Sequence, residues 1–156
     1  MIRIALPGLP DLLISDLVLD YNGTLAVEGN PVSGVLDRLN RLSEKAVIHV
    51  VTADTFGTAS AALSGESLTL TVLPPHNQAD AKSEYVRKLG SDTVAALGNG
   101  RNDRKMFEEA GLSIALIQQE GAYLPAVKVA DLVFTSINDA LDSLLNPARI
   151  TASLRT

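Results

Sequence analysis

The chain contains no cysteine, and this absence excludes a fold held together by disulfide bonds. It has no apolar run approaching the ~20 residues that cross a bilayer, so we expect no membrane-spanning helix. The first residues do not have the layout of a signal peptide. Acidic residues outnumber basic ones by 18 to 13, and a net charge of −5 argues against a protein whose main role is to grip nucleic acid. We therefore expect a cytoplasmic protein with no membrane and no nucleic-acid partner.

What the sequence does contain is enough apolar material for one core. Its 156 residues fall in the size range of one domain, and 46% of them are apolar. We therefore predict a single domain over residues 1–156.

Short apolar runs alternate with amphipathic stretches along most of this domain. The runs end at polar, glycine or proline positions, as strands buried on both faces do, and they lie at residues 18–19, 46–51, 69–73, 94–97 and 132–134. The stretches with helical spacing are residues 32–42, 79–89, 103–110 and 137–145. This alternation predicts a three-layer α/β fold, a Rossmann-like parallel sheet with helices on both faces. A hairpin of residues 2–5 and 12–14 is expected before it, and residues 149–156 are expected to form a short helix or a solvated tail.

Polar residues follow the predicted strands at the edge where ligands bind in such sheets. Asp20 comes directly after an apolar run, and an aspartate there can act as a nucleophile toward phosphorus. Thr52 ends the next run, and Asn99 and Asp103 follow a third one with oxygens suited to Mg²⁺. Lys82, near the start of a predicted helix, can reach the same edge and neutralise a phosphate.

Each of these residues, taken alone, also fits a purely structural role. Asp20 fits a turn, and Thr52 and Asp103 fit the N-caps of the helices that follow them. Lys82 fits a solvated position on its helix. The alternatives remain open on the residues alone, and the order in which the residues occur distinguishes them.

Four polar segments occur in this order along the chain: Asp20-Tyr21-Asn22-Gly23-Thr24, Thr52, Lys82 and Gly98-Asn99-Gly100-Arg101-Asn102-Asp103. Together they resemble the four motifs of the haloacid dehalogenase (HAD) superfamily of phosphotransferases. The likeness is strongest to the phosphorylation domain of P-type ATPases and to the small, capless family of soluble P-type-ATPase-like phosphatases. The resemblance implies a HAD-like fold, an aspartyl-phosphate mechanism, Mg²⁺ as cofactor and a phosphorylated substrate, either a small molecule or a macromolecule.

The resemblance also implies a role for each matching residue. The catalytic set is Asp20, Asn22, Thr52 and Lys82. The phosphoryl group is contacted by Gly23, Thr24, Ala53 and Asn102. The magnesium ligands are Asp20, the main-chain carbonyl of Asn22, Asn99 and Asp103.

Two residues depart from the usual pattern of the superfamily. Asn22 stands where most of its phosphatases have an aspartate that acts as general acid and base, and an amide cannot carry a proton in this way. Because general acid–base catalysis contributes about 10²–10⁴-fold, we expect slow turnover. Asn99 stands where a metal-binding aspartate is usual, so we expect weaker binding of Mg²⁺.

The spacing between the motifs leaves no room for a cap domain or for the nucleotide-binding domain of a pump. Only residues 25–31 are available as a small flap over the site. An open site is expected to accept a large substrate or to be covered by neighbouring subunits in a homo-oligomer.

Two functions therefore remain. The first is a Mg²⁺-dependent phosphatase or phosphotransferase that acts through Asp20. The second is a non-catalytic, regulatory phosphoacceptor module, which Asn22 and Asn99 favour because both weaken hydrolysis more than phosphorylation. A dinucleotide-binding domain is disfavoured because its glycine fingerprint is missing.

Overall fold

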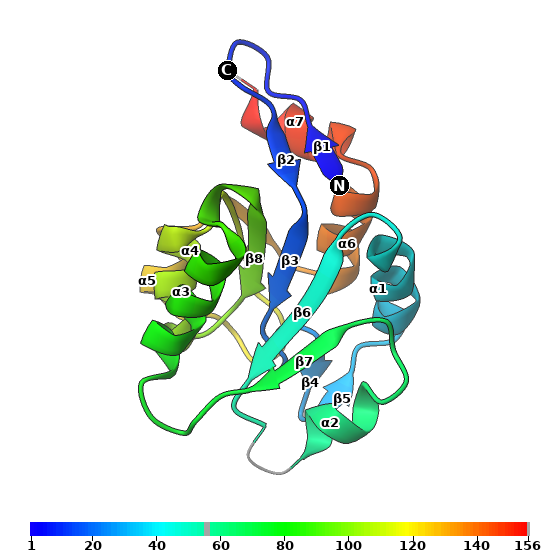
Figure 1. Cartoon of the computed structure of the whole chain (residues 1–156), viewed down its shortest axis with the longest axis vertical. Coiled ribbons are helices and arrows are strands. Elements are labelled where there is room, and N and C mark those ends of the chain that lie inside the picture. The colour runs from blue at the N-terminus through cyan, green and yellow to red at the C-terminus, as the bar shows by residue number, and fades with distance from the viewer. Residues whose placement is uncertain (55–56, 156) are drawn as a thin grey trace.

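The centre of the molecule is a six-stranded sheet in which every neighbouring pair is parallel, in the order β10-β9-β8-β3-β6-β7. Figure 1 shows its strands β8, β3, β6 and β7 side by side. The structure is a computed structural model that describes residues 1–54 and 57–155. The strands of this sheet are β3 (Asp16–Leu19), β6 (Val47–Thr52), β7 (Thr69–Val72), β8 (Val94–Gly98), β9 (Leu112–Leu116) and β10 (Leu132–Phe134). The predicted α/β fold with a parallel sheet is confirmed.

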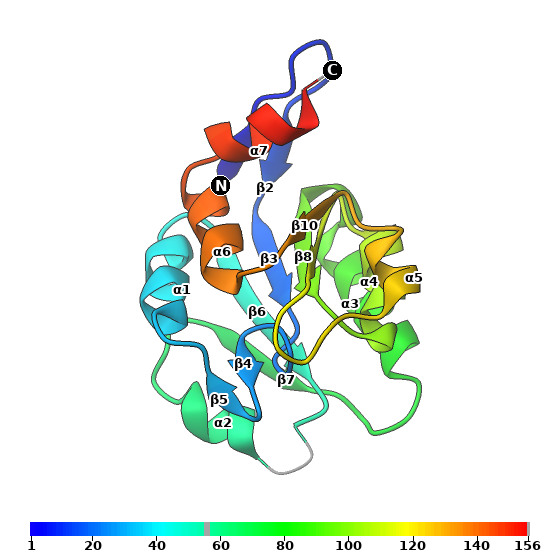
Figure 2. The same cartoon turned by 180° about the vertical axis from the view of Figure 1, so that it is seen from behind.

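Helices cover both faces of the sheet, because its strands are apolar on both sides (Figures 1 and 2). In β3, Leu17 and Leu19 pack into one core cluster and Val18 packs into the other. The first cluster lies under α1 (Val35–Ser43), α2 (Thr58–Ala62), α6 (Ile137–Leu145) and α7 (Ala148–Leu154). The second lies under α3 (Gln78–Leu89), α4 (Arg104–Glu109) and α5 (Leu124–Val127). The described residues also form the short 3-10 helices η1 (Ser91–Thr93) and η2 (Arg101–Asp103).

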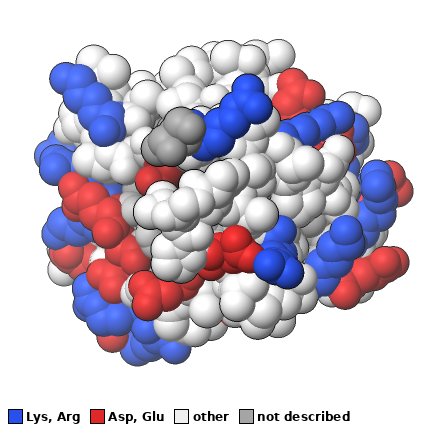
Figure 3. Space-filling view, turned by 90° about the horizontal axis from the view of Figure 1, so that it is seen from above, with Lys and Arg blue, Asp and Glu red and all other residues white. Residues whose placement is uncertain are grey.

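Both ends of the described chain are ordered against the core. The predicted hairpin is present, with β1 (Ile2–Ile4) pairing antiparallel to β2 (Leu12–Ile14). Residues 148–154 form α7, which buries Ile150, so the helix is found rather than the solvated tail. Thr156, the last residue of that predicted segment, lies outside the described residues. Around the end that carries these elements, acidic and basic side chains are interspersed (Figure 3).

The sequence prediction gives no range for the strand β9 or for the short helices α2 and α5, and it misplaces one helix start. All five residues of β9 are buried, yet the short run that contains Ser113 gives little periodic signal. The first helix begins at Val35 rather than at residue 32, because Gly34 at its N-cap adopts a left-handed conformation with φ of 83°. Val32 instead donates its N–H to the carbonyl of Leu25.

A small flap rises next to the strand that precedes Asp20, and it corresponds to the predicted segment 25–31. It consists of β4 (Ala26–Val27) paired antiparallel to β5 (Asn30–Pro31). Within the described residues, no other subdomain is inserted between the strands, in line with the predicted absence of a cap. Among the helices that the structure describes, none has the length and apolar character needed to cross a membrane.

Candidate active site

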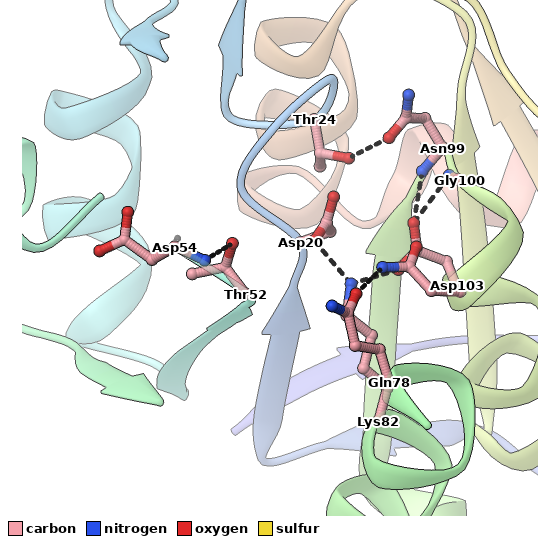
Figure 4. A network of polar contacts seen from close by, with 10 residues as sticks. Asp20, Thr24, Thr52, Asp54, Gln78, Lys82, Asn99, Gly100 and Asp103 are labelled. Carbon is pink, nitrogen blue, oxygen red and sulfur yellow. Dashed lines mark hydrogen bonds and ion pairs between the residues drawn. The ribbon is translucent and has the colours of Figure 1, made fainter. Parts of the chain in front are cut away.

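Three neighbouring central strands deliver the predicted site residues to one edge of the sheet (Figure 4). Asp20 directly follows β3, Thr52 is the last residue of β6, and Asn99 directly follows β8. Since β3 lies between β6 and β8, their carboxyl ends lie side by side. The fold therefore brings together residues that are far apart in the sequence, as predicted.

The centre of the site is a lysine held between two aspartates. The Nζ atom of Lys82 lies 2.6 Å from Oδ1 of Asp20 and 2.6 Å from Oδ1 of Asp103. The side chains of Lys82 and Asp103 are fully buried, and 11% of the Asp20 side chain is exposed. A buried ammonium needs such partners, so the solvated position open to Lys82 on sequence grounds is excluded. Both carboxylates share one cation, which leaves the buried trio with a net negative charge.

The pKa values of Asp20 and Lys82 follow from burial and from the sharing of one ammonium by two carboxylates. Burial raises the pKa of Asp20 to about 6, because it outweighs the attraction of Lys82, and the nearby Asp103 adds to the rise. Burial alone lowers the pKa of Lys82, but the charges of Asp20 and Asp103 outweigh it and hold the pKa above its usual value. Lys82 is therefore cationic, and Asp20 is the carboxylate whose charge the fold stabilises least.

The loop after β8 is shaped around Asp103. Its Oδ2 atom accepts hydrogen bonds from the backbone N–H of Asn99 at 3.0 Å and of Gly100 at 2.8 Å. The same carboxylate covers Gly98 so closely that a Cβ atom there would lie 2.5 Å from Cγ of Asp103. Only glycine fits at position 98. Asp103 precedes α4 without capping it through its side chain, so its plain N-cap role is not observed.

The turn after Asp20 packs against the same loop. Gly23 has a φ of 77°, and a Cβ atom on it would lie 2.2 Å from Nδ2 of Asn99, so both conformation and space require glycine. The buried Thr24 hydroxyl donates to Oδ1 of Asn99 at 3.4 Å. Asn99 in turn donates through Nδ2 to the carbonyl of Gly121 at 3.0 Å. The amide at position 99 thus joins three loops, and its donor function could not be supplied by an aspartate.

The remaining predicted residues lie around this centre. Asn22, next to Gly23, is exposed at the rim. Thr52 is buried and its hydroxyl accepts the N–H of Asp54 at 3.3 Å. It is not the N-cap of α2, which is Gly57, and the carboxylate of Asp54 accepts N–H groups from the first turn of that helix. Ala53 lies between Thr52 and Asp54 and is partly exposed.

Asn102 lies on the other side of the site. Its Nδ2 atom donates to Oε1 of Gln78 at 2.9 Å. Gln78 begins α3 one turn before Lys82. This bond therefore ties the loop after β8 to the helix that carries the lysine.

Sequence reasoning missed Gln118, which clamps the nucleophile turn from the loop after β9. Its Nε2 atom donates to the carbonyls of Gly23 at 3.2 Å and Thr24 at 2.9 Å. Its Oε1 atom accepts the N–H of Ile137 at the start of α6, at 2.8 Å. No local pattern marks a glutamine for such a role.

We expect Gln118→Leu to lower the free energy of unfolding by about 1–3 kcal/mol, because it leaves partly buried backbone groups without partners. Urea denaturation followed by circular dichroism measures the change. The matched control is Gln119→Leu, an exposed neighbour without a side-chain hydrogen bond in the described chain, for which we expect a change within about 0.5 kcal/mol. Equal effects of the two substitutions would contradict the clamp.

The donor set at this edge fits Mg²⁺ held mainly by oxygen atoms and water. Residues 1–54 and 57–155 hold no cluster of three or more acidic, histidine or cysteine side chains that could bind a metal. Mg²⁺ commonly binds through one or two carboxylates and retains several waters. Asp20 has one carboxylate oxygen with no hydrogen-bond partner in the described chain, and the amide oxygen of Asn99 receives only the long bond from Thr24. Both oxygens of Asp103 accept protein donors, one of which is Lys82.

Comparison with known proteins agrees with this geometry. A family model described as haloacid dehalogenase-like hydrolase matches residues 79–145, which include Lys82 and the loop after β8. An uncharacterized protein of Methanocaldococcus jannaschii is 44% identical over 72 residues, which cover 46% of this chain and 77% of that protein.

Solved structures share the fold over nearly the whole chain. The cobalt-bound deoxy-D-mannose-octulosonate 8-phosphate phosphatase of Haemophilus influenzae superimposes with a TM-score of 0.72 at 12% identity, covering 89% of this chain and 91% of that one. The 3-deoxy-D-manno-octulosonate 8-phosphate phosphatase of Moraxella catarrhalis, solved with magnesium, phosphate and the sugar acid, gives a TM-score of 0.66 at 16% identity, covering 90% of each chain. At these identities the likeness establishes the fold.

Proposed function

We propose, since this chain belongs to the haloacid dehalogenase-like hydrolases, that it is a Mg²⁺-dependent phosphatase or phosphotransferase whose nucleophile is Asp20. The observation that carries the proposal is the Asp20–Lys82–Asp103 trio at the carboxyl edge of a parallel sheet. It combines a carboxylate at the rim with a buried cation beside it.

In the first step, a carboxylate oxygen of Asp20 attacks the phosphorus of a phosphomonoester. A bond forms between this oxygen and phosphorus, and the bond between phosphorus and the leaving alcohol breaks. Oδ1 of Asp20 is held by Lys82, which fixes the direction of the carboxylate that attacks. Lys82 orients the carboxylate and offsets the charge on the phosphoryl oxygens, and Thr24 and Thr52 offer hydroxyl groups nearby.

In the second step, a water molecule attacks the same phosphorus and breaks its bond to Asp20, which releases phosphate and restores the carboxylate. The leaving alcohol must take a proton in the first step, and the water must lose one in the second. The side chain of Asn22 does not exchange protons in this way, so both transfers fall to solvent. Both steps are therefore expected to be slow, the release of the phosphoryl group from Asp20 included.

The metal ligands that we propose are the carboxylate of Asp20, the main-chain carbonyl of Asn22 and the amide oxygen of Asn99. Mg²⁺ bound there would neutralise charge on the phosphoryl oxygens. Asp103, expected as a ligand from the sequence, also remains a proposed ligand, since a carboxylate has about four lone-pair sites and only three donors occupy them. Gly23, Thr24, Ala53 and Asn102 remain the proposed contacts of the phosphoryl group.

The test is phosphate release from a panel of small phosphomonoesters with Mg²⁺ and with EDTA, using Asp20→Asn in parallel. We expect release that depends on the metal and is absent from the variant. Release that persists in Asp20→Asn would exclude Asp20 as the nucleophile. Intact-mass spectrometry after rapid quenching should show one phosphoryl group on the parent protein.

The second candidate is a phosphoacceptor module that holds its phosphoryl group, and the amide at position 22 favours it. Asn22 is exposed two residues after Asp20, where an aspartate could reach the leaving group and the water. We expect Asn22→Asp to raise steady-state turnover by about 10-fold or more, since general acid–base catalysis contributes roughly 10²–10⁴-fold. The readouts are phosphate release and the lifetime of the phosphorylated protein.

The control is Asn30→Asp on the flap, which adds the same charge outside the trio and should leave turnover within about 3-fold. A parent protein that is phosphorylated but releases no phosphate, and a variant that does release it, would favour the phosphoacceptor. No change in turnover in Asn22→Asp would show that proton transfer does not limit either step.

For the uncovered site, a large substrate or a lid from a second copy of the chain both remain proposals.

A further inference from the structure

A pocket of about 920 Å³ adjoins the active site, between the start of α3 and the η2–α4 segment. Gln78 and Asn102, bonded to each other at 2.9 Å, belong to its wall, and Gln78 lies beside Lys82 in Figure 4. Gln78 lies one turn before Lys82, and Asn102 directly precedes Asp103. The pocket therefore adjoins the position of a phosphoryl group bound at Asp20.

The charged side chains of the pocket are paired, with one exception. Arg104 lies 3.0 Å from Glu108, and Lys105 is paired with Asp80. Arg101 is exposed and makes no ion pair or side-chain hydrogen bond with any other residue in the described parts of the chain, 1–54 and 57–155. The pocket thus has one uncompensated positive charge, in a protein whose net charge is −5.

We propose that Arg101 binds an anionic group on the leaving portion of the substrate. The substrate class is then a small phosphomonoester that carries a second anionic group, either a carboxylate or another phosphate. The guanidinium group suits both, because its planar fork pairs with two oxygens at once. The reacting phosphoryl group already has Lys82 as its cation, whereas no other unpaired cation lines the pocket among the described residues. This proposal rests on the proposed phosphatase function.

Matched substrate pairs test it. We would compare 3-phosphoglycerate with glycerol 3-phosphate, which differ by a carboxylate, and fructose 1,6-bisphosphate with fructose 6-phosphate, which differ by a phosphate. The parent protein should prefer the more anionic member of at least one pair, and that pair identifies the group. Arg101→Gln should lower kcat/KM for that member by about 10-fold or more, because a hydrogen bond to a charged group is lost. For the less anionic member we expect a change within about 3-fold.

Arg149→Gln is the control, since Arg149 is exposed on α7 and its loss removes the same charge away from the site. It should change neither kcat/KM value. An equal loss for both members in Arg101→Gln, or no preference in the parent protein, would overturn the proposal.

Failure of the phosphatase function itself has a different signature, namely no phosphate release from any substrate. In that case we would measure by calorimetry the binding of 3-phosphoglycerate and of glycerol 3-phosphate. The two proteins compared are Asp20→Asn and the same variant with Arg101→Gln added. Tighter binding of the anionic ligand that is lost with Arg101 would support the pocket's role. An affinity for 3-phosphoglycerate that is unchanged by Arg101→Gln would overturn it.

Discussion

The Asp20→Asn variant should lose its turnover by about 10⁴-fold or more and yet be more stable than the parent protein. Turnover is lost because an amide oxygen does not attack phosphorus as a carboxylate does. Stability rises because the fold buries two carboxylates around one ammonium, and the substitution leaves Lys82 and Asp103 as a balanced pair. The rise of the Asp20 pKa from 3.8 to about 6 corresponds to at most about 3 kcal/mol.

The gain should depend on pH in a defined direction. The folded protein holds the proton of Asp20 more tightly than the unfolded chain does, so parent stability falls as pH rises from about 4 to 6. The two proteins should therefore match near pH 4 and differ fully above pH 6 or so. Urea denaturation in EDTA across this range measures the difference, and added Mg²⁺ should stabilise the parent protein more than the variant. A variant less stable than the parent protein in EDTA at neutral pH would show that attraction to Lys82 exceeds the cost of burial.

Lys82→Met should be among the most destabilising single changes in the chain. It leaves Asp20 and Asp103 buried side by side without their shared cation, and breaking a buried pair in this way costs about 3–5 kcal/mol. This is a large part of the 5–15 kcal/mol or so that stabilises a domain. Catalysis should be lost as well, because nothing then offsets the charge of the phosphoryl group. Chemical denaturation at neutral pH is the measurement.

The control is Lys88→Met on the same helix, whose side chain is 74% exposed and which we expect to change stability by no more than about 0.5 kcal/mol. If Lys82→Met does not fold at neutral pH, the double variant with Asp103→Asn should fold, since a single carboxylate then remains. A decrease of less than about 1 kcal/mol in the free energy of unfolding of Lys82→Met would contradict this prediction, because the two carboxylates would then tolerate the loss of their shared cation.

Much of this arrangement was predictable because it depends on local order in the chain. Asp20, Thr52 and Asn99 each follow an apolar run, and parallel strands bring their carboxyl ends to one edge. Lys82 was predictable from its place in the order of the motifs, because its position near the start of a helix also fits a solvated side chain. Its complete burial was not, because burial depends on Asp20 and Asp103, which lie 62 and 21 positions away.

The features that sequence reasoning missed depend on distant contacts. Gln118 acts on carbonyl groups 94 and 95 positions earlier, and no neighbouring residue indicates this. In β9, Ser113 interrupts a short apolar run, and its hydroxyl is satisfied by the carboxylate of Asp131. The assignment of Asp103 as a metal ligand rested on its residue type and on the resemblance of its motif to the superfamily. The structure shows that its oxygens are already engaged by Lys82 and by two backbone N–H groups.

The distances in sequence that separate Asp20, Thr24, Lys82 and Asn99 also affect how the protein acquires its site. Contacts between residues 62 and 75 positions apart form only when the strands between them have closed onto the sheet. Loops of that length are costly to close, and folds dominated by such contacts fold slowly. The site should therefore appear together with the last cooperative phase of folding. Recovery of phosphate release during refolding would then follow the global signal, with no active partly folded species before it.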